Sequence, residues 1–155
     1  MTTPTSQEIE QKRAQLRNWV SADQTQATTR GVDHIAVFAR DLEETAAFYT
    51  NVMGMPVVNV TSNRDVPEST HMNVSVGNGM QLSFFDFPHV PRLQRRAPEG
   101  VGGVMHIALG ISKERLAEVK GRLDHHRARY QEVGGSVYLK DPNGLGIELM
   151  PTGHS

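Results

Sequence analysis

Two histidines and one glutamate stand at positions in the sequence that suit a metal site. His34 and His106 lie in the similar phrases Asp33-His34-Ile35-Ala36 and Met105-His106-Ile107-Ala108, and each phrase opens a predicted strand. Glu148 lies in the last predicted strand of the chain. Two imidazoles and one carboxylate form the facial triad that leaves coordination positions of a divalent metal open to substrate or dioxygen. We therefore expect these three side chains to bind one metal ion.

The amino-acid composition narrows the kind of metal site. The sequence contains no cysteine, which excludes a disulfide framework and a thiolate zinc site. Imidazole and carboxylate ligands suit iron(II), manganese, zinc, nickel or cobalt. A site with open coordination positions is therefore expected rather than a closed structural one.

Each histidine phrase leads from a strand into a helix, so the pattern predicts one unit written twice. In the first copy the helix begins at Leu42 with Asp41 as its predicted N-cap, and in the second it begins at Lys113 with Ser112 as its cap. Both copies end in hairpin-like strands, and Asn78-Gly79 is a strong hairpin signal. The pattern predicts tandem modules of a strand, a helix and three strands, which form a core by pairing with each other.

Alternation along the strands predicts which face carries the triad. The apolar positions that we expect on the helix-covered face are Ile35, Val37, Ile107, Leu109, Val137, Leu139, Ile147 and Leu149. The opposite parity contains His34, His106 and Glu148, together with Gln81, Ser83, Ser136 and Tyr138. If the sheet curls with its helices outside, all of these residues lie on one concave surface.

Residues 1–30 lie outside the repeat and are predicted to form a tail followed by an accessory helix over residues 7–20. Residues 31–155 form the predicted metal-binding domain, with modules at about 31–88 and 103–151. The connector between the modules carries a cluster of Arg92, Arg95 and Arg96, which would suit a substrate carboxylate if it lay near the site.

Length and charge exclude several classes of function. The chain has 155 residues, enough for one domain with a real core, and a formal net charge of −1, which gives no reason to expect nucleic acid as a partner. The sequence shows neither a targeting signal nor an apolar run long enough to cross a membrane. The prediction is a soluble cytoplasmic protein.

Three motifs resemble those of the vicinal oxygen chelate superfamily, which contains glyoxalases, epimerases, fosfomycin and bleomycin resistance proteins and extradiol dioxygenases. The motifs are Val32-Asp33-His34-Ile35-Ala36-Val37, Val104-Met105-His106-Ile107-Ala108-Leu109 and Tyr138-Leu139-Lys140-Asp141-Pro142-Asn143-Gly144-Leu145-Gly146-Ile147-Glu148-Leu149. The resemblance covers about residues 31–151. It implies an α+β fold of tandem βαβββ modules in a U-shaped mixed sheet around a metal cleft, with the N-terminal helix added.

The resemblance also assigns roles to residues. It places the three metal ligands on His34, His106 and Glu148, and it places a fourth ligand of many members on Gln81. Members of the superfamily often dimerise, sometimes completing the cleft across two subunits, so a homodimer is expected here. In the extradiol dioxygenases a tyrosine lies ten residues before the carboxylate ligand, as Tyr138 does here, and its phenol could hydrogen-bond a bound catecholate.

The first functional hypothesis is an iron(II)-dependent extradiol ring-cleavage dioxygenase that acts on a small catechol, such as the carboxylate-bearing L-DOPA, with dioxygen. Those enzymes use a histidine beside the metal as acid and base, where this chain has Gln81 and Ser83. His71, on the inward parity, is the first candidate for that role. The other candidates are His89, His125 and His126.

Two other functions stay open. A glyoxalase-type lyase, isomerase or epimerase would use Gln81 as a fourth ligand and a non-redox metal as a Lewis acid. A metal-free drug-binding resistance protein would keep the fold without using the triad. Iron(II) with oxygen uptake would favour the dioxygenase, nickel, cobalt or zinc the lyase, and an empty site the resistance protein.

Overall fold

The computed structural model describes residues 3–21, 27–91 and 100–153, and the chain divides into two compact units, Met1–Gly31 and Val32–Ser155. The first unit contains helix α1, Ser6–Arg17, whose residues are all exposed. A capping box between Thr5 and Glu8 starts this helix, which ends before the predicted Val20.

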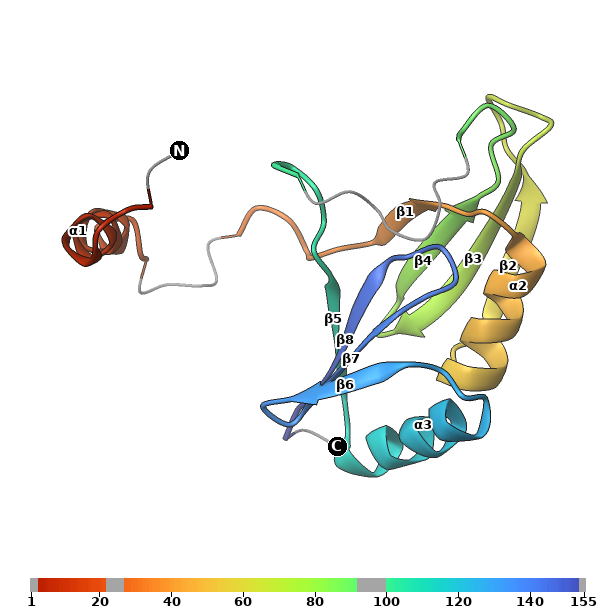
Figure 1. The fold of residues 1–155 in the computed structure, drawn as a ribbon. Coiled ribbons are helices and arrows are strands. Elements are labelled where there is room, and N and C mark those ends of the chain that lie inside the picture. Colours follow the sequence, from red (N-terminus) through yellow and green to blue (C-terminus); the bar gives the residue numbers. More distant parts are fainter. Residues whose placement is uncertain (1–2, 22–26, 92–99, 154–155) are drawn as a thin grey trace. The chain divides into compact units, whose positions relative to one another are not determined.

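The second unit contains two modules, each with a strand, a helix and three strands in that order (Figure 1). The first module consists of β1 (His34–Phe38), α2 (Leu42–Ala47), η2 (Phe48–Met53), β2 (Val57–Ser62), β3 (Thr70–Gly77) and β4 (Met80–Phe85). The second consists of β5 (Ile107–Ile111), α3 (Lys113–His125), β6 (Tyr130–Val133), β7 (Ser136–Lys140) and β8 (Gly146–Pro151). The predicted duplication is confirmed.

Local signals in the sequence account for where these elements begin and turn. The Asp41 side chain accepts a hydrogen bond from the Glu44 amide at 2.9 Å and caps α2, as predicted. Ser112 caps α3 in the same way. Asn78 and Gly79 both have positive φ, as a tight hairpin turn of this kind requires. The sequence pattern did not predict that α2 continues as the π-helix η2, which ends at the left-handed Gly54.

The strands form two four-stranded sheets, one in each module. The first has the order β1-β4-β3-β2 and the second the order β5-β8-β7-β6. In each sheet the outer β1 or β5 runs parallel to its neighbour and the other pairs are antiparallel, so both sheets are mixed and the fold is α+β, as predicted. Among the described residues all strand pairing stays within a module, which makes β1 and β5 edge strands.

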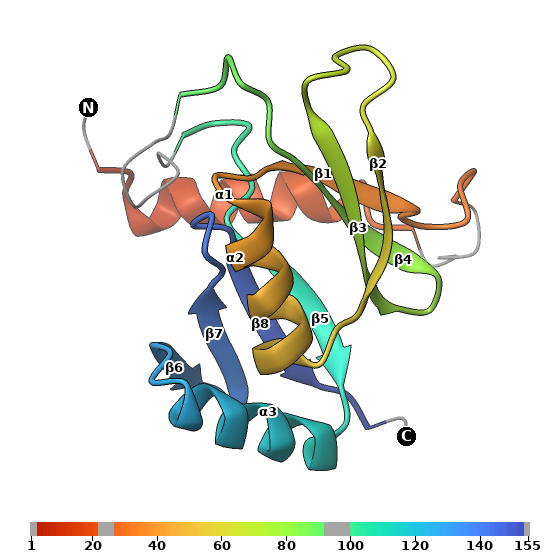
Figure 2. The same ribbon diagram turned by 90° about the vertical axis from the view of Figure 1, so that its right-hand side faces the viewer.

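The two modules contact each other through their helices and through one turn. Helix α3 packs against η2 (Figure 2), and the Arg122 guanidinium donates a hydrogen bond from Nε to the Val52 carbonyl oxygen at 2.8 Å. The buried Tyr49 hydroxyl donates to Oδ2 of Asp141, at 3.1 Å, in the turn between β7 and β8. These contacts join the helix side of one module to the other and leave the edges of β1 and β5 open.

The core lies between the helices and the sheets, on the predicted strand parity. Alternate residues of β5, β7 and β8 are buried together with the apolar stripe of α3. The buried members are Ile107, Leu109, Val137, Leu139, Ile147, Leu149, Leu116, Val119 and Leu123. The corresponding β1 residues, Ile35 and Val37, are half-buried against this core. The opposite parity of each strand is therefore free to carry a site.

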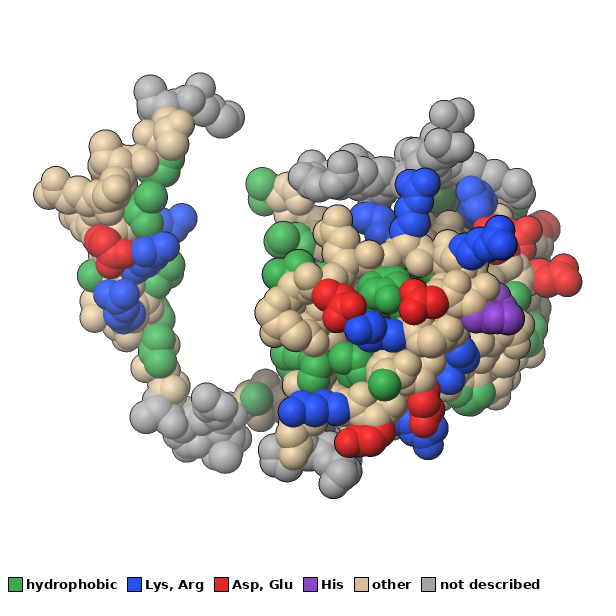
Figure 3. Space-filling model, turned by 60° about the horizontal axis from the view of Figure 1, so that its bottom comes forward, with side chains coloured by type: hydrophobic (Ala, Val, Ile, Leu, Met, Phe, Trp, Pro, Cys, Tyr) green, Lys and Arg blue, Asp and Glu red, His purple; other side chains and the backbone are tan. Residues whose placement is uncertain are grey.

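The face of the molecule shown in Figure 3 carries no large patch of a single charge. Basic and acidic side chains alternate there, which agrees with the near-neutral net charge. Among the described residues, every helix is too short or too polar to span a membrane.

Candidate metal centre

Two of the three predicted ligands meet on the second sheet. Glu148 lies in β8 and His106 immediately precedes β5, the parallel neighbour of β8. Nε2 of His106 lies 3.1 Å from Oε2 of Glu148. Two ligands at right angles around an ion with bonds of about 2.1 Å would be about 3 Å apart. The pair thus has the spacing of adjacent ligands of one metal ion.

A glycine gives His106 the room to approach β8. A Cβ atom built on Gly146 would lie 2.5 Å from the Met105 carbonyl oxygen and 3.1 Å from the His106 Cβ. Such distances would force the backbone before β5 to move away. Gly146 therefore sets the close approach that brings the imidazole to Glu148.

Neighbouring hydroxyl groups orient the Glu148 carboxylate. Tyr138 lies directly opposite Glu148 in the β7–β8 ladder, and Ser136 shares the parity of Tyr138. Hydrogen bonds from Ser136 first, then from Tyr138, and the adjacent His106 lower the pKa of Glu148. The bond to Glu148 in turn raises the pKa of the Tyr138 phenol. Both shifts favour an ionised carboxylate beside a protonated phenol, and the carboxylate is the form that binds metal.

The third predicted ligand, His34, lies at the start of β1 on the other sheet. Its Nδ1 lies 2.7 Å from Oδ1 of Asp33, and its side chain is 55% exposed. A carboxylate on one ring nitrogen fixes the orientation of an imidazole and leaves Nε2 for a metal. The imidazole of His34 is therefore oriented for metal binding, but the other two predicted ligands, His106 and Glu148, lie on the second sheet.

A single chain does not bring the triad together. Within residues 3–21, 27–91 and 100–153, no three histidine, aspartate or glutamate side chains are close enough to hold one metal ion. The reason is the separation of the sheets, because His34 belongs to edge strand β1 and His106 to the segment entering edge strand β5. Large apolar side chains at these edges are exposed, including Phe38 at 61% and Met105 at 86%.

Gln81 lies beside His34, as expected for a fourth ligand. The two residues are partners in the β1–β4 register. Oε1 of Gln81 already accepts a hydrogen bond from Nδ2 of Asn73 at 2.6 Å. This bond orients the amide so that its oxygen keeps one lone pair for a further contact.

His71 lies on the same face as His34 but at the other end of the sheet. The register pairs His71 and Phe38 with Phe85, four residues along from the level of His34, which corresponds to roughly 13 Å at the rise of a strand. The ring of His71 stacks on Phe85 with centroids 4.3 Å apart, and its Nε2 is buried without a protein partner among the described residues. The structure therefore gives His71 no short path to the level of His34.

The other histidines lie outside both sheets. His89 follows β4 and contacts Phe87, and His125 and His126 end α3 with their rings 5.1 Å apart. The arginine cluster at Arg92, Arg95 and Arg96 lies outside the described residues.

Two imidazoles, one carboxylate and an adjacent amide oxygen are donors that fit a divalent metal ion. The spacing of His106 and Glu148 and the Asp33 contact of His34 agree with that fit. Within one chain His106 and Glu148 are close enough to hold one ion together, and His34 with the neighbouring Gln81 carries further donors of the same kind on the other sheet.

The two βαβββ modules of the second unit can be compared with known families. Residues 31–149 match the Glyoxalase/Bleomycin resistance protein/Dioxygenase superfamily. The chain belongs to this superfamily, which confirms the resemblance inferred from its motifs.

Individual relatives have different activities in their names. The putative ring-cleaving dioxygenase MhqE of Bacillus subtilis is 39% identical over 130 residues, which are 79% of this chain and 41% of MhqE. The lactoylglutathione lyase GLX1 of Arabidopsis thaliana is 28% identical over 131 residues, 77% of this chain and 44% of that enzyme. This chain therefore spans less than half the length of each of these two relatives.

A solved structure shows the same fold at lower identity. The fosfomycin resistance protein FosX of Listeria monocytogenes, in complex with Mn(II) and sulfate, superposes with a TM-score of 0.61. The match has 22% sequence identity and covers 81% of this chain and 94% of FosX. At this identity the comparison supports the fold.

Sequence reasoning missed the groups that support the ligands. The contact between Asp33 and His34 joins neighbours in the sequence, so the Asp-His pair itself was a signal. The bond from Ser136 to Glu148 follows from the strand parity once Glu148 is a ligand. The close approach at Gly146 had no signal beyond the glycine itself.

Proposed function

We propose that this protein is an iron(II)-dependent extradiol dioxygenase that opens the ring of a small catechol. The observation that carries the proposal is the pair of His106 and Glu148 at 3.1 Å, with the Tyr138 phenol on the same carboxylate. The 39% identity to a putative ring-cleaving dioxygenase favours this chemistry over the others in the superfamily.

The residues around the site would act mainly by orientation and proton placement. Iron(II), when bound, supplies Lewis acidity and redox chemistry toward dioxygen. Tyr138 and Ser136 keep Glu148 ionised and aimed at the ion, and Asp33 keeps Nε2 of His34 available. The protonated Tyr138 hydroxyl donates its one proton to Glu148, and it would have to turn from Glu148 to donate a hydrogen bond to an anionic substrate oxygen. His71 stays a prediction as the acid–base residue, and the register places it roughly 13 Å from the level of His34.

We further propose that two copies of the chain complete each site. His34 of one copy would join His106 and Glu148 of the other when edge strand β1 meets edge strand β5. The exposed apolar residues just before these strands, Val32, Val104 and Met105, support this arrangement because an exposed apolar edge favours pairing. A homodimer would then contain two sites.

Mixing two inactive variants tests this arrangement. His34→Ala and Glu148→Ala each destroy both sites of a homodimer, whereas a mixed dimer keeps one intact site and one that lacks two ligands. After mixing at equal amounts and subunit exchange, about a quarter of the wild-type sites should return, because half of the dimers are mixed. No recovery after proven exchange would show that each site belongs to one chain. His125→Ala, a surface histidine variant, should be fully active alone.

The reaction itself is tested by reconstituting the protein anaerobically with iron(II), manganese, cobalt, nickel or zinc. A catechol panel that includes L-DOPA is then followed for oxygen uptake and for the yellow ring-opened product. Iron-dependent uptake that matches product formation supports the dioxygenase. Metal binding without oxygen uptake on any catechol would contradict it.

A glyoxalase-type lyase is the second candidate, favoured by the position of Gln81 beside His34 and by the similarity to GLX1. Nickel, cobalt or zinc would then act as a Lewis acid. Isomerisation of a hemithioacetal by the nickel form, without oxygen uptake, would select this function.

A further inference from the structure

We propose that the pocket between the two modules of one chain binds an aromatic carboxylate, with the ring on Phe38 and the carboxylate at Lys140. The pocket has a volume of about 300 Å³, which is at the lower end for small-molecule sites and suits a single substituted ring. This proposal uses neither the triad nor a metal ion, and so it does not rest on the proposed reaction.

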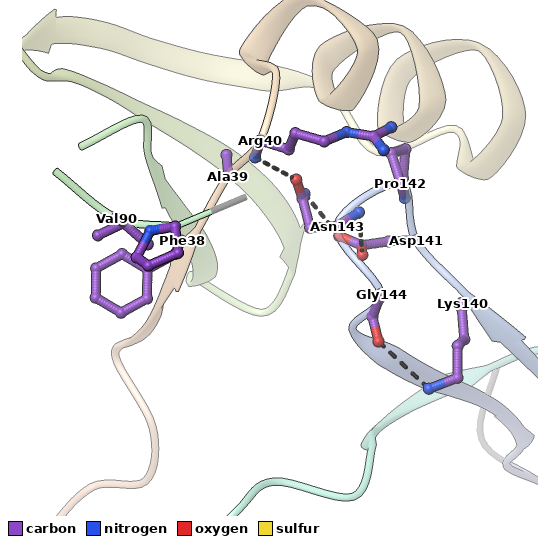
Figure 4. A pocket seen from close by; sticks show the side chains of 10 residues that line it. Phe38, Ala39, Arg40, Val90, Lys140, Asp141, Pro142, Asn143 and Gly144 are labelled. Carbon is purple, nitrogen blue, oxygen red and sulfur yellow. Dashed lines mark hydrogen bonds between the residues drawn. The ribbon is translucent and has the colours of Figure 1, made fainter. Parts of the chain in front are cut away.

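The two walls of the pocket differ in chemistry (Figure 4). One wall is apolar and consists of Phe38, Val90 and Pro91, where β1 ends and the chain after β4 crosses it. The other wall is the polar turn between β7 and β8, with Lys140 at the end of β7 where the turn begins. A ligand that fills the pocket therefore needs an apolar face and a polar end.

The apolar wall is held rigid although Phe38 itself is exposed. Phe38 packs edge-on against Phe87 with centroids 5.7 Å apart, and Phe87 stacks on Phe85 at 5.6 Å. Phe85 in turn stacks on His71. A 61% exposed phenylalanine on such a fixed aromatic support offers a planar ring a preorganised partner, and aromatic pairs gain energy beyond the area that they bury.

On the polar wall most groups are already engaged within the protein. The Asp141 carboxylate accepts hydrogen bonds from the Asn143 and Leu145 amides and from Tyr49. The Asn143 side chain binds the Arg40 amide and Thr45. These satisfied groups shape the wall but have little capacity left for a ligand.

The two cationic side chains of the pocket, Arg40 and Lys140, differ in whether the protein already pairs their charge. The Arg40 guanidinium is paired with Glu44 at 2.8 Å, so its charge is compensated. Nζ of the exposed Lys140 has one contact among the described residues, with the Gly144 carbonyl oxygen at 3.4 Å, which is long for a hydrogen bond. Asp141 is the acidic residue in the lining, and its carboxylate is turned inward and buried. Lys140 is therefore the group that selects a ligand carboxylate.

The test measures binding of phenylacetate to the metal-free, full-length protein by NMR, with 2-phenylethanol and acetate as probes that lack the charge or the ring. Phenylacetate should shift the amide signals of Phe38, Lys140 and Asn143 and should bind at least tenfold more tightly than either partial probe. Lys140→Met should weaken phenylacetate about tenfold, which corresponds to about 1.4 kcal/mol, and leave 2-phenylethanol unchanged. Phe38→Leu should weaken both aromatic probes.

The matched control is Lys113→Met, which removes another exposed lysine, at the start of α3. It should bind phenylacetate like the wild type. Both test side chains are exposed, and unchanged NMR spectra of the free variants establish that they fold. The proposal is overturned if phenylacetate shifts signals elsewhere only, or if Lys140→Met and Lys113→Met bind it equally.

Discussion

The Glu148 carboxylate is held by groups from one neighbouring strand and from the segment before another strand, and each of these groups lies on the same strand parity. Tyr138 and Ser136 reach it from β7, and His106 reaches it from the start of β5. This parity could be predicted from the alternation of polar and apolar residues. The support of His34 by Asp33 and the room left by Gly146 could not, because both depend on where backbone atoms come to lie.

Removing the Tyr138 hydroxyl should weaken metal binding. Tyr138→Phe takes one donor from Glu148, so the pKa of Glu148 should rise toward its usual value and metal affinity should fall about tenfold or more. Calorimetric titration with cobalt(II) or iron(II) measures the affinity. Tyr130→Phe, which removes a hydroxyl bound to Asp124 away from the site, is the control and should bind metal normally. Equal affinities of the two variants would exclude the orienting role of Tyr138.

At the scale of the elements, the helices and one turn join the modules. The C-terminal end of η2 meets α3 through Arg122, and the turn after β7 meets η2 through Asp141 and Tyr49. Caps, turns and strand parity were predictable from short sequence patterns. The π-helix and these contacts between the modules were not, because they depend on residues far apart in the chain.

Arg122→Met should destabilise the fold while keeping most of the buried alkyl chain. It removes the hydrogen bond of a charged donor to the Val52 carbonyl, so the free energy of unfolding should fall by about 1–3 kcal/mol. Urea unfolding followed by circular dichroism gives the value. Arg115→Met on the same helix breaks only a surface pair with Glu118 and should change the free energy of unfolding by less than about 1 kcal/mol. Equal losses in the two variants would show that the contact between the modules adds nothing.

Asp141 should make stability depend on pH in the direction opposite to most carboxylates. Burial raises its pKa, against the hydrogen bonds from Leu145, Asn143 and Tyr49 that lower it, and the residue is only 5% exposed. When the pKa of a carboxyl group is raised by folding, its whole contribution to stability is present below the pKa that it has in the unfolded chain. That contribution is lost as the pH rises through the pKa that it has in the folded protein.

The comparison is between the wild type and Asp141→Asn, which does not titrate at this position. From about pH 4 upward, the unfolding free energy of the wild type should decrease relative to that of the variant. Urea titrations at several pH values measure this difference, in which the effects of Glu148 and other common groups cancel. A difference that stays constant, or that grows with pH, would contradict the assignment.

At the scale of the whole molecule, the two similar histidine phrases were enough to predict the duplicated module. The fold class followed from that duplication. The separation into two sheets was not readable, because a repeated pattern does not specify whether the copies pair in one chain or between chains. The three ligand positions were predicted on a shared surface, yet one chain brings only His106 and Glu148 together. Under the proposed shared site, His34 of a second copy would supply the third ligand.

The proposed shared site makes metal binding depend on protein concentration. Dilution through the range in which dimers dissociate should release the metal and lower the activity per chain, because a separated copy keeps only two of the three ligands. Sedimentation velocity and metal content, measured on the same dilution series, should change together. A monomer that retains its metal would contradict the shared site.

The open strands β1 and β5 also bear on how the protein should be produced. If edge strand β1 of one copy pairs with edge strand β5 of another, as proposed, two copies can close a ring, whereas a row of copies leaves an unpaired edge at each end. Slow addition of denatured chains to a large volume should favour closed pairs, and rapid concentration should favour precipitates. The yield of refolding should therefore pass through a maximum as the chain concentration rises.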